Sequence, residues 1–154
     1  MTTELEELYQ QVLLDHSKRP RNFGEIGEGA IVVHGDNPSC GDEIHLHVKP
    51  SPEGGVEDVK FTGQGCAISM ASASMMTLKI KGKPRSEALA MIREFHDLVT
   101  GAADNGAQQL GDLRLMQGVR KFPQRVKCAM LAWRALEQAL SETSAIETQV
   151  STEH

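Results

Sequence analysis

Aromatic residues are scarce in this sequence: they make up 4% of its 154 residues and include a single Trp and a single Tyr. Hydrophobic residues make up 40%, so we expect a core of aliphatic side chains, alanine and methionine. No apolar run approaches the length of a membrane span, and the acidic start of the chain does not resemble a signal or transit peptide. These absences predict a cytoplasmic protein with no membrane partner.

Positive charge is also limited, because 16 Lys and Arg residues stand against 21 Asp and Glu residues and give a formal net charge of -5. A general nucleic-acid binder needs a basic face that releases counterions from phosphates. We therefore expect no nucleic-acid partner. The length predicts instead one domain that folds without disulfide support.

Cysteine occurs three times, an odd number, and never as a Cys-x-x-Cys pair. Without a secretory signal, this favours reduced thiols over a disulfide framework and argues against a thioredoxin-like oxidoreductase. Asp42 follows Cys40 by two residues, and with Cys66 and Cys128 it completes four candidate ligands, the number that tetrahedral zinc or a two-iron cluster needs. Spacing alone leaves open whether the cysteines share such a site or are small core hydrophobes.

Hydrophobic periodicity predicts an α+β fold. Helices are expected over 4–16, 66–76, 87–99, 112–117 and 123–140, and strands over 30–34, 43–49 and 56–62. The short turns between the strands indicate a small three-stranded antiparallel sheet, with the helices packed on one face. The stretch 141–154 is polar and unpatterned, so we expect a single domain over 1–140 followed by a disordered tail.

The strand expected over 43–49 places hydrophobic residues on one face and His45 and His47 on the other. Two histidines on one face could bind a metal, but Glu43 and Lys49 share that face, so we expect it to be solvated. A helix that must bury one side likewise assigns three methionines to the core rather than to a metal: Met70, Met75 and Met76.

Three cysteine motifs occur in an order that is known from one protein family. They are Asn37-Pro38-Ser39-Cys40-Gly41-Asp42, Gly63-Gln64-Gly65-Cys66-Ala67-Ile68-Ser69 and Arg125-Val126-Lys127-Cys128. The helical opening is similar as well, through Asp15-His16, Pro20-Arg21-Asn22 and Gly24. In these motifs the chain from Leu8 to about Leu140 resembles the IscU/SufU family of iron–sulfur cluster assembly proteins.

Within that family the resemblance is closer to the SufU branch. An extra segment separates Cys66 from Cys128, and Lys127 stands where the IscU branch has a histidine. The double-proline motif by which IscU proteins recruit their dedicated chaperone is missing, since residues 122–127 read Phe-Pro-Gln-Arg-Val-Lys. The resemblance therefore carries no expectation of chaperone-assisted cluster release.

The resemblance implies a SufE/IscU-like fold in which Cys40, Asp42, Cys66 and Cys128 bind Zn²⁺ and a SufS-like cysteine desulfurase supplies sulfur. Cys40 lies in a loop rich in Pro, Ser and Gly and is expected to move most easily, so it is the expected acceptor of the persulfide sulfur. Alternatively, the same ligands hold a [2Fe–2S] cluster that is assembled and handed to downstream apo-proteins. In the first role the chain is a zinc-dependent sulfurtransferase or sulfur acceptor rather than a free-standing enzyme.

The ligand chemistry fits either role. A carboxylate is a harder ligand than a thiolate and should hold a soft metal centre less firmly. It therefore favours a site that can exchange its metal or cluster. Four anionic ligands leave two negative charges beside a divalent ion or an oxidised two-iron core, and Arg125 or Lys127 is expected to offset them. A zinc hydrolase is disfavoured because four protein ligands leave no position for water.

Overall fold

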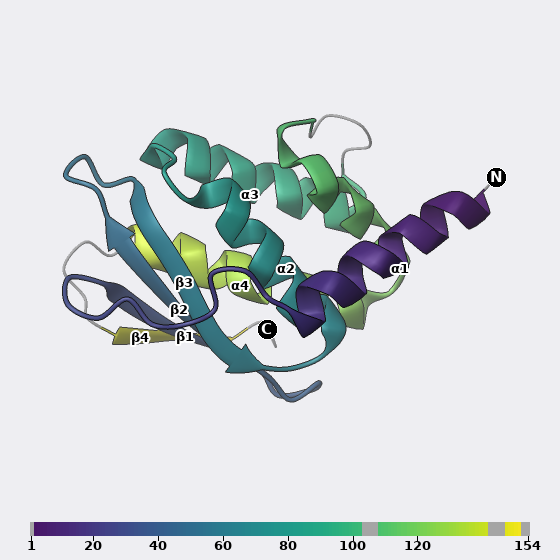
Figure 1. Ribbon diagram of the computed structural model, residues 1–154, viewed down its shortest axis with the longest axis horizontal. Helices are drawn as coiled ribbons and strands as arrows, with labels where there is room; N and C mark the ends of the chain where they lie inside the picture. The colour runs from purple at the N-terminus through teal and green to yellow at the C-terminus, as the bar shows by residue number, and fades with distance from the viewer. Residues whose placement is uncertain (1, 103–107, 142–146, 152–154) are drawn as a thin grey trace.

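The computed structural model describes residues 2–102, 108–141 and 147–151. Its elements follow one another as α1 (Thr2–Lys18), β1 (Ile31–Asn37), β2 (Asp42–Pro50), β3 (Val56–Gln64), α2 (Ala67–Ile80), α3 (Arg85–Thr100), the 3₁₀ helix η1 (Gln108–Lys121), α4 (Pro123–Ser141) and β4 (Glu147–Ser151) (Figure 1). The predicted α+β class is confirmed, with a strand-rich layer and a helical layer.

The first three strands form the predicted antiparallel meander. β1 pairs with β2 from Ile31 opposite Val48 to Asn37 opposite Asp42, and β2 pairs with β3 along its other edge. A fourth strand, β4, lies parallel to β1, so the sheet order is β3-β2-β1-β4. The sheet therefore has one strand more than the sequence indicated.

The expected disordered tail over 141–154 differs from the structure at two places. α4 includes Ser141, and Glu147–Ser151 forms β4 beside β1. The pairing uses backbone groups at the edge of β1, and such pairing needs no hydrophobic pattern in the added strand. Residues 142–146 and 152–154 lie outside the described part of the chain. The division into a domain over 1–140 and a tail stays a prediction.

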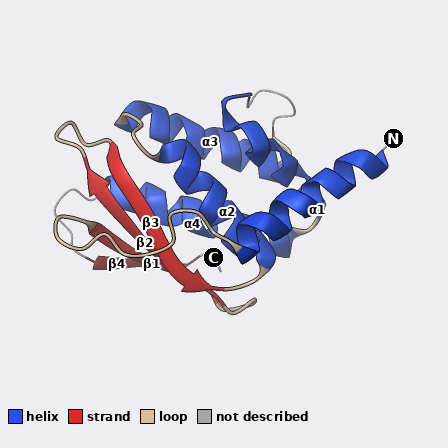
Figure 2. Ribbon diagram, in the orientation of Figure 1, coloured by secondary structure: helices blue, strands red, loops and turns tan. Residues whose placement is uncertain are grey.

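Helices cover one face of the sheet, as predicted (Figure 2). α4 packs on β1 and β2, and α2 packs on β3. The buried face of the sheet carries the alternating hydrophobic residues of β2, and six methionines and many alanines fill the helical layer. Phe95 stacks on Trp133 with ring centroids 4.5 Å apart. The expected core is confirmed, including the burial of Met70, Met75 and Met76.

The opposite face of the sheet is less solvated than the sequence indicated. The loop after α1 joins the edge of β3, where the Gly24 N–H donates to the Phe61 carbonyl and the Phe61 N–H donates to the Asn22 carbonyl. His47 is only 8% exposed, so the expectation of a solvated position is wrong for this residue. Burial lowers the pKa of His47, and the carboxylate of Glu25 in the same loop opposes that shift.

The segment between α3 and α4 is more regular than expected. In place of a short helix over 112–117, the 3₁₀ helix η1 runs from Gln108 to Lys121 and is broken by Gly111, whose φ is 56°. Gly118 does not end it. In the described part of the chain, no helix is long and apolar enough to cross a membrane.

Candidate metal centre

The turn between β1 and β2 carries Cys40 to the surface. Asn37 and Asp42 form the last pair of the ladder, and the Asn37 carbonyl accepts the backbone N–H groups of Cys40 (3.1 Å) and Gly41 (2.9 Å). Gly41 adopts a φ of 72°, a conformation that glycine reaches without strain. Cys40 is exposed in this turn, while Asn37 below it is fully buried.

Asp42 is fixed more firmly than a loop residue would be. It is the first residue of β2, it is 2% exposed, and its Oδ1 accepts the backbone N–H of Cys66 at 2.9 Å. The Cys66 thiol lies 3.9 Å from Asp42 Oδ2. A Cβ at Gly65 would come within 2.5 Å of Asp42 Oδ1, so only glycine allows this approach. Asp42 is therefore held in place by β2 and by the start of α2, while Cys40 lies in the exposed turn.

Cys128 forms the buried base of the site. It lies in α4, is 2% exposed, and its Sγ is 3.4 Å from Cys40 Sγ. The Asn37 side-chain amide donates to Cys128 Sγ at 3.8 Å, and the Gln124 amide donates to Cys40 Sγ at 2.9 Å. The first turn of α4 thus contacts the β1–β2 turn directly.

Three of the four expected ligands converge closely. One ligand atom from each of Cys40, Asp42 and Cys128 lies within 4.8 Å of the other two, the one such group of three or more His, Cys, Asp or Glu residues in the described part of the chain. Cys66 lies beside this group through its contacts with Asp42. Ligands that bond a tetrahedral zinc ion at 2.0–2.3 Å lie roughly 3.3–3.8 Å apart. The Cys40–Cys128 separation of 3.4 Å lies within that range, and the Cys66–Asp42 separation of 3.9 Å lies just above it.

The chemistry of the donors also fits a cation. Burial raises the pKa of the Cys128 thiol, and hydrogen bonding to Asp42 and Cys40 raises it further. A thiol in such a place becomes a thiolate only when a positive charge compensates it. The set of three sulfurs and one carboxylate oxygen suits zinc or iron rather than magnesium or calcium.

Packing within the helical layer holds Cys66 and Cys128 in place. The buried Ser72 hydroxyl of α2 donates to the Ala129 carbonyl of α4 at 2.7 Å and accepts the Trp133 indole N–H at 3.0 Å. This bridge joins the helix that begins beside Cys66 to the helix that contains Cys128. Cys40 and Cys66 are both exposed, but Cys40 lies in the turn between two strands, whereas Cys66 is the residue that immediately precedes α2.

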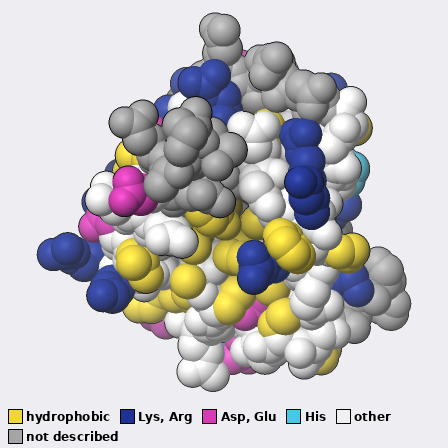
Figure 3. Space-filling view, turned by 90° about the vertical axis from the view of Figure 1, so that its right-hand side faces the viewer, with side chains coloured by type: hydrophobic (Ala, Val, Ile, Leu, Met, Phe, Trp, Pro, Cys, Tyr) yellow, Lys and Arg dark blue, Asp and Glu magenta, His cyan; other side chains and the backbone are white. Residues whose placement is uncertain are grey.

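Exposed nonpolar side chains and one arginine lie on two segments next to the site, α1 and the start of α4. Arg125 lies over the ring of Phe122, 4.4 Å from its centroid, and Phe122 and Leu8 are nearly half exposed. Burial raises the pKa of Tyr9. The charge of Arg125 opposes this shift and Cys66 adds to it, so Tyr9 lies near Arg125 and Cys66. Figure 3 shows hydrophobic side chains gathered around a basic one on the face at the free end of α1.

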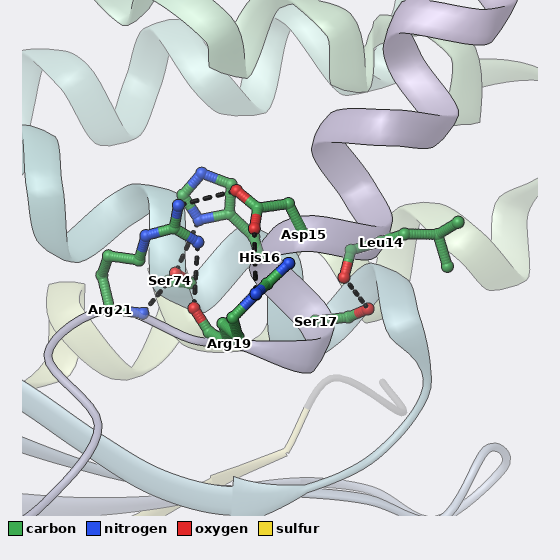
Figure 4. A network of polar contacts seen from close by, with 7 residues as sticks. All are labelled: Leu14, Asp15, His16, Ser17, Arg19, Arg21 and Ser74. Atoms are coloured by element: carbon green, nitrogen blue, oxygen red, sulfur yellow. Dashed lines mark hydrogen bonds and ion pairs between the residues drawn. The ribbon is translucent and has the colours of Figure 1, made fainter.

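The opening motif of the sequence anchors α1 rather than joining the site. His16 is 7% exposed, and its Nδ1 lies 2.7 Å from the Ser74 hydroxyl, which also accepts the backbone N–H of Arg21 (Figure 4). Arg21 in turn pairs with Asp15 at 2.6 Å. The network ties the end of α1 and the following loop to α2.

Two contacts of the site were not predicted from the sequence. Asn37 was identified only as part of a motif, although its position opposite Asp42 gives its amide access to Cys128. Gln124 precedes Cys128 by four residues, the spacing that puts two side chains on one face of a helix, and this signal could have identified it.

Comparison with known proteins places the chain in a family. Residues 8–149 match the family described as NifU-like N terminal domain. The zinc-dependent sulfurtransferase SufU of Bacillus subtilis (strain 168) is 50% identical over 138 residues, which cover 90% of this chain and 92% of that protein. The iron–sulfur cluster assembly scaffold protein IscU of Streptococcus pyogenes serotype M1 is 45% identical, over 92% and 88% of the two chains.

A solved structure agrees with these sequence matches. The iron–sulfur cluster assembly scaffold protein for the SUF system from Fervidobacterium islandicum AW-1 superposes with a TM-score of 0.78 at 38% identity. The match covers 84% of this chain and 94% of that one. From its matched motifs, its fold and its relatives, the chain belongs to the NifU-like N-terminal domain family, the family of SufU and IscU iron–sulfur cluster assembly proteins.

Proposed function

We propose that the chain binds Zn²⁺ through Cys40, Asp42, Cys66 and Cys128 and accepts persulfide sulfur from a cysteine desulfurase on Cys40. One observation carries this proposal: Cys40 is exposed on a turn, 3.4 Å from the buried Cys128, whereas the other three donors lie on β2, α2 and α4 or at their ends. One thiol can therefore move while three side chains keep their places.

The proposed transfer conserves electrons. Zinc bound by these residues would supply the positive charge that keeps their thiols as thiolates at neutral pH. The Cys40 thiolate attacks the outer sulfur of the desulfurase persulfide, so a new S–S bond forms on Cys40. The S–S bond of the desulfurase breaks, and its cysteine leaves as a thiolate. The result is a persulfide on Cys40 with no net oxidation.

Exposed nonpolar side chains on α1 and at the start of α4 support docking of a protein partner near the site. Leu8 and Phe122 are both nearly half exposed, and Arg125 adds one positive charge over the Phe122 ring. Exposed apolar groups beside a reactive thiol are typical of a surface that binds another protein. A SufS-like desulfurase is therefore the proposed sulfur donor.

A second role rests on the donor set itself. Three cysteine sulfurs and one carboxylate can hold a [2Fe–2S] cluster, and two relatives carry scaffold in their names. In this role the chain assembles the cluster and passes it to downstream apo-proteins. Both roles use the same residues.

The residue assignment is tested by locating the transferred sulfur. Zinc-loaded chain, a SufS-like desulfurase and cysteine are mixed, and the mass added by one sulfur atom is mapped to a residue by mass spectrometry. We expect it on Cys40, and Cys40→Ala should lose at least 90% of the acceptance, whereas the neighbouring Ser39→Ala should keep it. First modification of Cys66 or Cys128, or acceptance by Cys40→Ala at the original rate, contradicts the assignment.

The two roles are separated by metal content and turnover. The chain is isolated without air, its zinc and iron are measured, and desulfurase turnover is recorded with and without it. Tightly held zinc with strong stimulation supports sulfur transfer. A stable iron–sulfur chromophore that moves to an apo-protein, with little stimulation, supports the scaffold role.

A further inference from the structure

Two histidines face each other across neighbouring strands on the side of the sheet away from the helices. His34 in β1 is the register partner of His45 in β2, and their ring centroids lie 4.2 Å apart in an edge-to-face arrangement. Directly opposed residues of an antiparallel pair have Cβ atoms about 5 Å apart, a distance from which two imidazoles reach a common ion. Neither residue takes part in the cysteine site.

Further donors lie around this pair. Glu43 Oε2 is 3.9 Å from His45 Nε2 and extends from the same strand face. His47, two residues beyond His45 on that face, is 8% exposed, and its Nδ1 has no hydrogen-bond partner among the described residues. A buried ring nitrogen without a partner is uncommon in folded proteins. The face therefore gathers three imidazoles and a carboxylate.

We propose that His34 and His45 form a second metal site, which takes a divalent transition metal of the kind that prefers imidazole ligands. Imidazole nitrogen is a good ligand for nickel, copper and zinc. Of these three metals, copper binds most tightly. Glu43 is the third protein ligand within reach, and water completes the coordination.

This site is weaker than the cysteine site and separate from it. In the described residues only Cys40, Asp42 and Cys128 form a preassembled group of three ligands, so the histidine pair offers two ligands before Glu43 moves. His34 precedes Asn37 by three residues, which is about 10 Å along a strand. His34 and Asn37 also point to opposite faces, because they are an odd number of residues apart. A metal at the pair would exchange readily with solvent.

The test measures Ni²⁺ binding by the untagged chain after one equivalent of Zn²⁺ has filled the cysteine site. Titration calorimetry gives the affinity, and metal analysis after the titration verifies that the zinc stays bound. We expect one Ni²⁺ per chain, at least tenfold weaker binding for His34→Asn and for His45→Asn, and no further loss when the two changes are combined. His96→Asn, which alters an exposed histidine of α3, is the matched control and should bind as the original chain does.

The spectroscopic arm identifies the ligands directly. Addition of Ni²⁺ should broaden the imidazole NMR signals of His34 and His45 before those of His96. Glu43→Gln should weaken binding severalfold, less than either histidine change. Unchanged affinity in His34→Asn and His45→Asn, or an equal loss in His96→Asn, overturns the proposal.

Discussion

The hydroxyl of Ser72 links α2, which begins beside Cys66, to α4, which contains Cys128. It is fully buried, accepts the Trp133 indole N–H and donates to the Ala129 carbonyl. Ser72→Ala leaves the indole N–H buried without this partner, so the free energy of unfolding should fall by about 1–3 kcal/mol. Urea unfolding of the zinc-loaded chain measures the change.

The matched control is Ser17→Ala, which removes an exposed hydroxyl that donates to the Leu14 carbonyl within α1. Its effect should stay below about 0.5 kcal/mol, as for most surface substitutions. Equal losses in the two variants would show that the Ser72 bridge adds nothing specific to the packing of α2 on α4.

At this scale the sequence predicted candidate ligands but not the residues that contact them. Cys40, Asp42, Cys66 and Cys128 follow from residue type and motif, and three of them converge in the structure. The contact between Gln124 and Cys40 joins residues 84 positions apart, so it depends on how α4 meets the β1–β2 turn. Local pattern does not contain that information.

At the scale of elements, α1 and its loop depend on a neutral histidine. Burial lowers the pKa of His16, and the charge of Arg21 lowers it further, while Asp15 and Asp112 oppose the shift. The unfolded chain therefore binds a proton at a higher pH than the folded chain does. Stability from this group is fully present above the ordinary histidine pKa of about 6.5 and is lost as the pH falls below it.

The expected result is a free energy of unfolding that decreases between pH 7 and pH 5. His16→Gln should reduce that slope, because glutamine takes no proton in this range. Part of the slope should remain, because burial also lowers the pKa of His47. Ser17→Ala, which removes an exposed hydroxyl and no ionisable group, should leave the slope as it is. Denaturant unfolding at several pH values compares both variants with the original chain, and an unchanged slope in His16→Gln contradicts the assignment.

Elements with a strong hydrophobic period were predictable, and those held by tertiary contacts were not. α1, α3, α4 and the three antiparallel strands follow from their patterns. η1 was predicted too short, because its turns pack on α3 and α4 without a clear helical period of their own. The burial of His47 depends on the loop after α1. The alternation of residues within β2 does not predict where that loop lies.

At the scale of the whole molecule, the core formed by the residues whose burial is described extends to Leu140. The last buried side chains belong to α4, among them Leu136, Ala139 and Leu140. A chain that ends at Ser141 should therefore unfold cooperatively and retain one zinc per molecule, with only a modest loss of stability from the absent β4. Thermal unfolding at low protein concentration and metal analysis test this, and loss of a cooperative transition would show that the tail belongs to the domain.

The arrangement of the sheet edges has a consequence for self-association. β4 occupies the free edge of β1, and the backbone of residues 22–24 occupies part of the edge of β3 through its bonds with Phe61. An uncovered strand edge offers a row of unpaired N–H and C=O groups to any passing chain. A chain without β4 exposes that row on β1, so two such molecules should pair edge to edge as their concentration rises. In the intact chain β4 covers this edge up to Asp36, next to the turn that carries Cys40, and is therefore expected to limit such pairing.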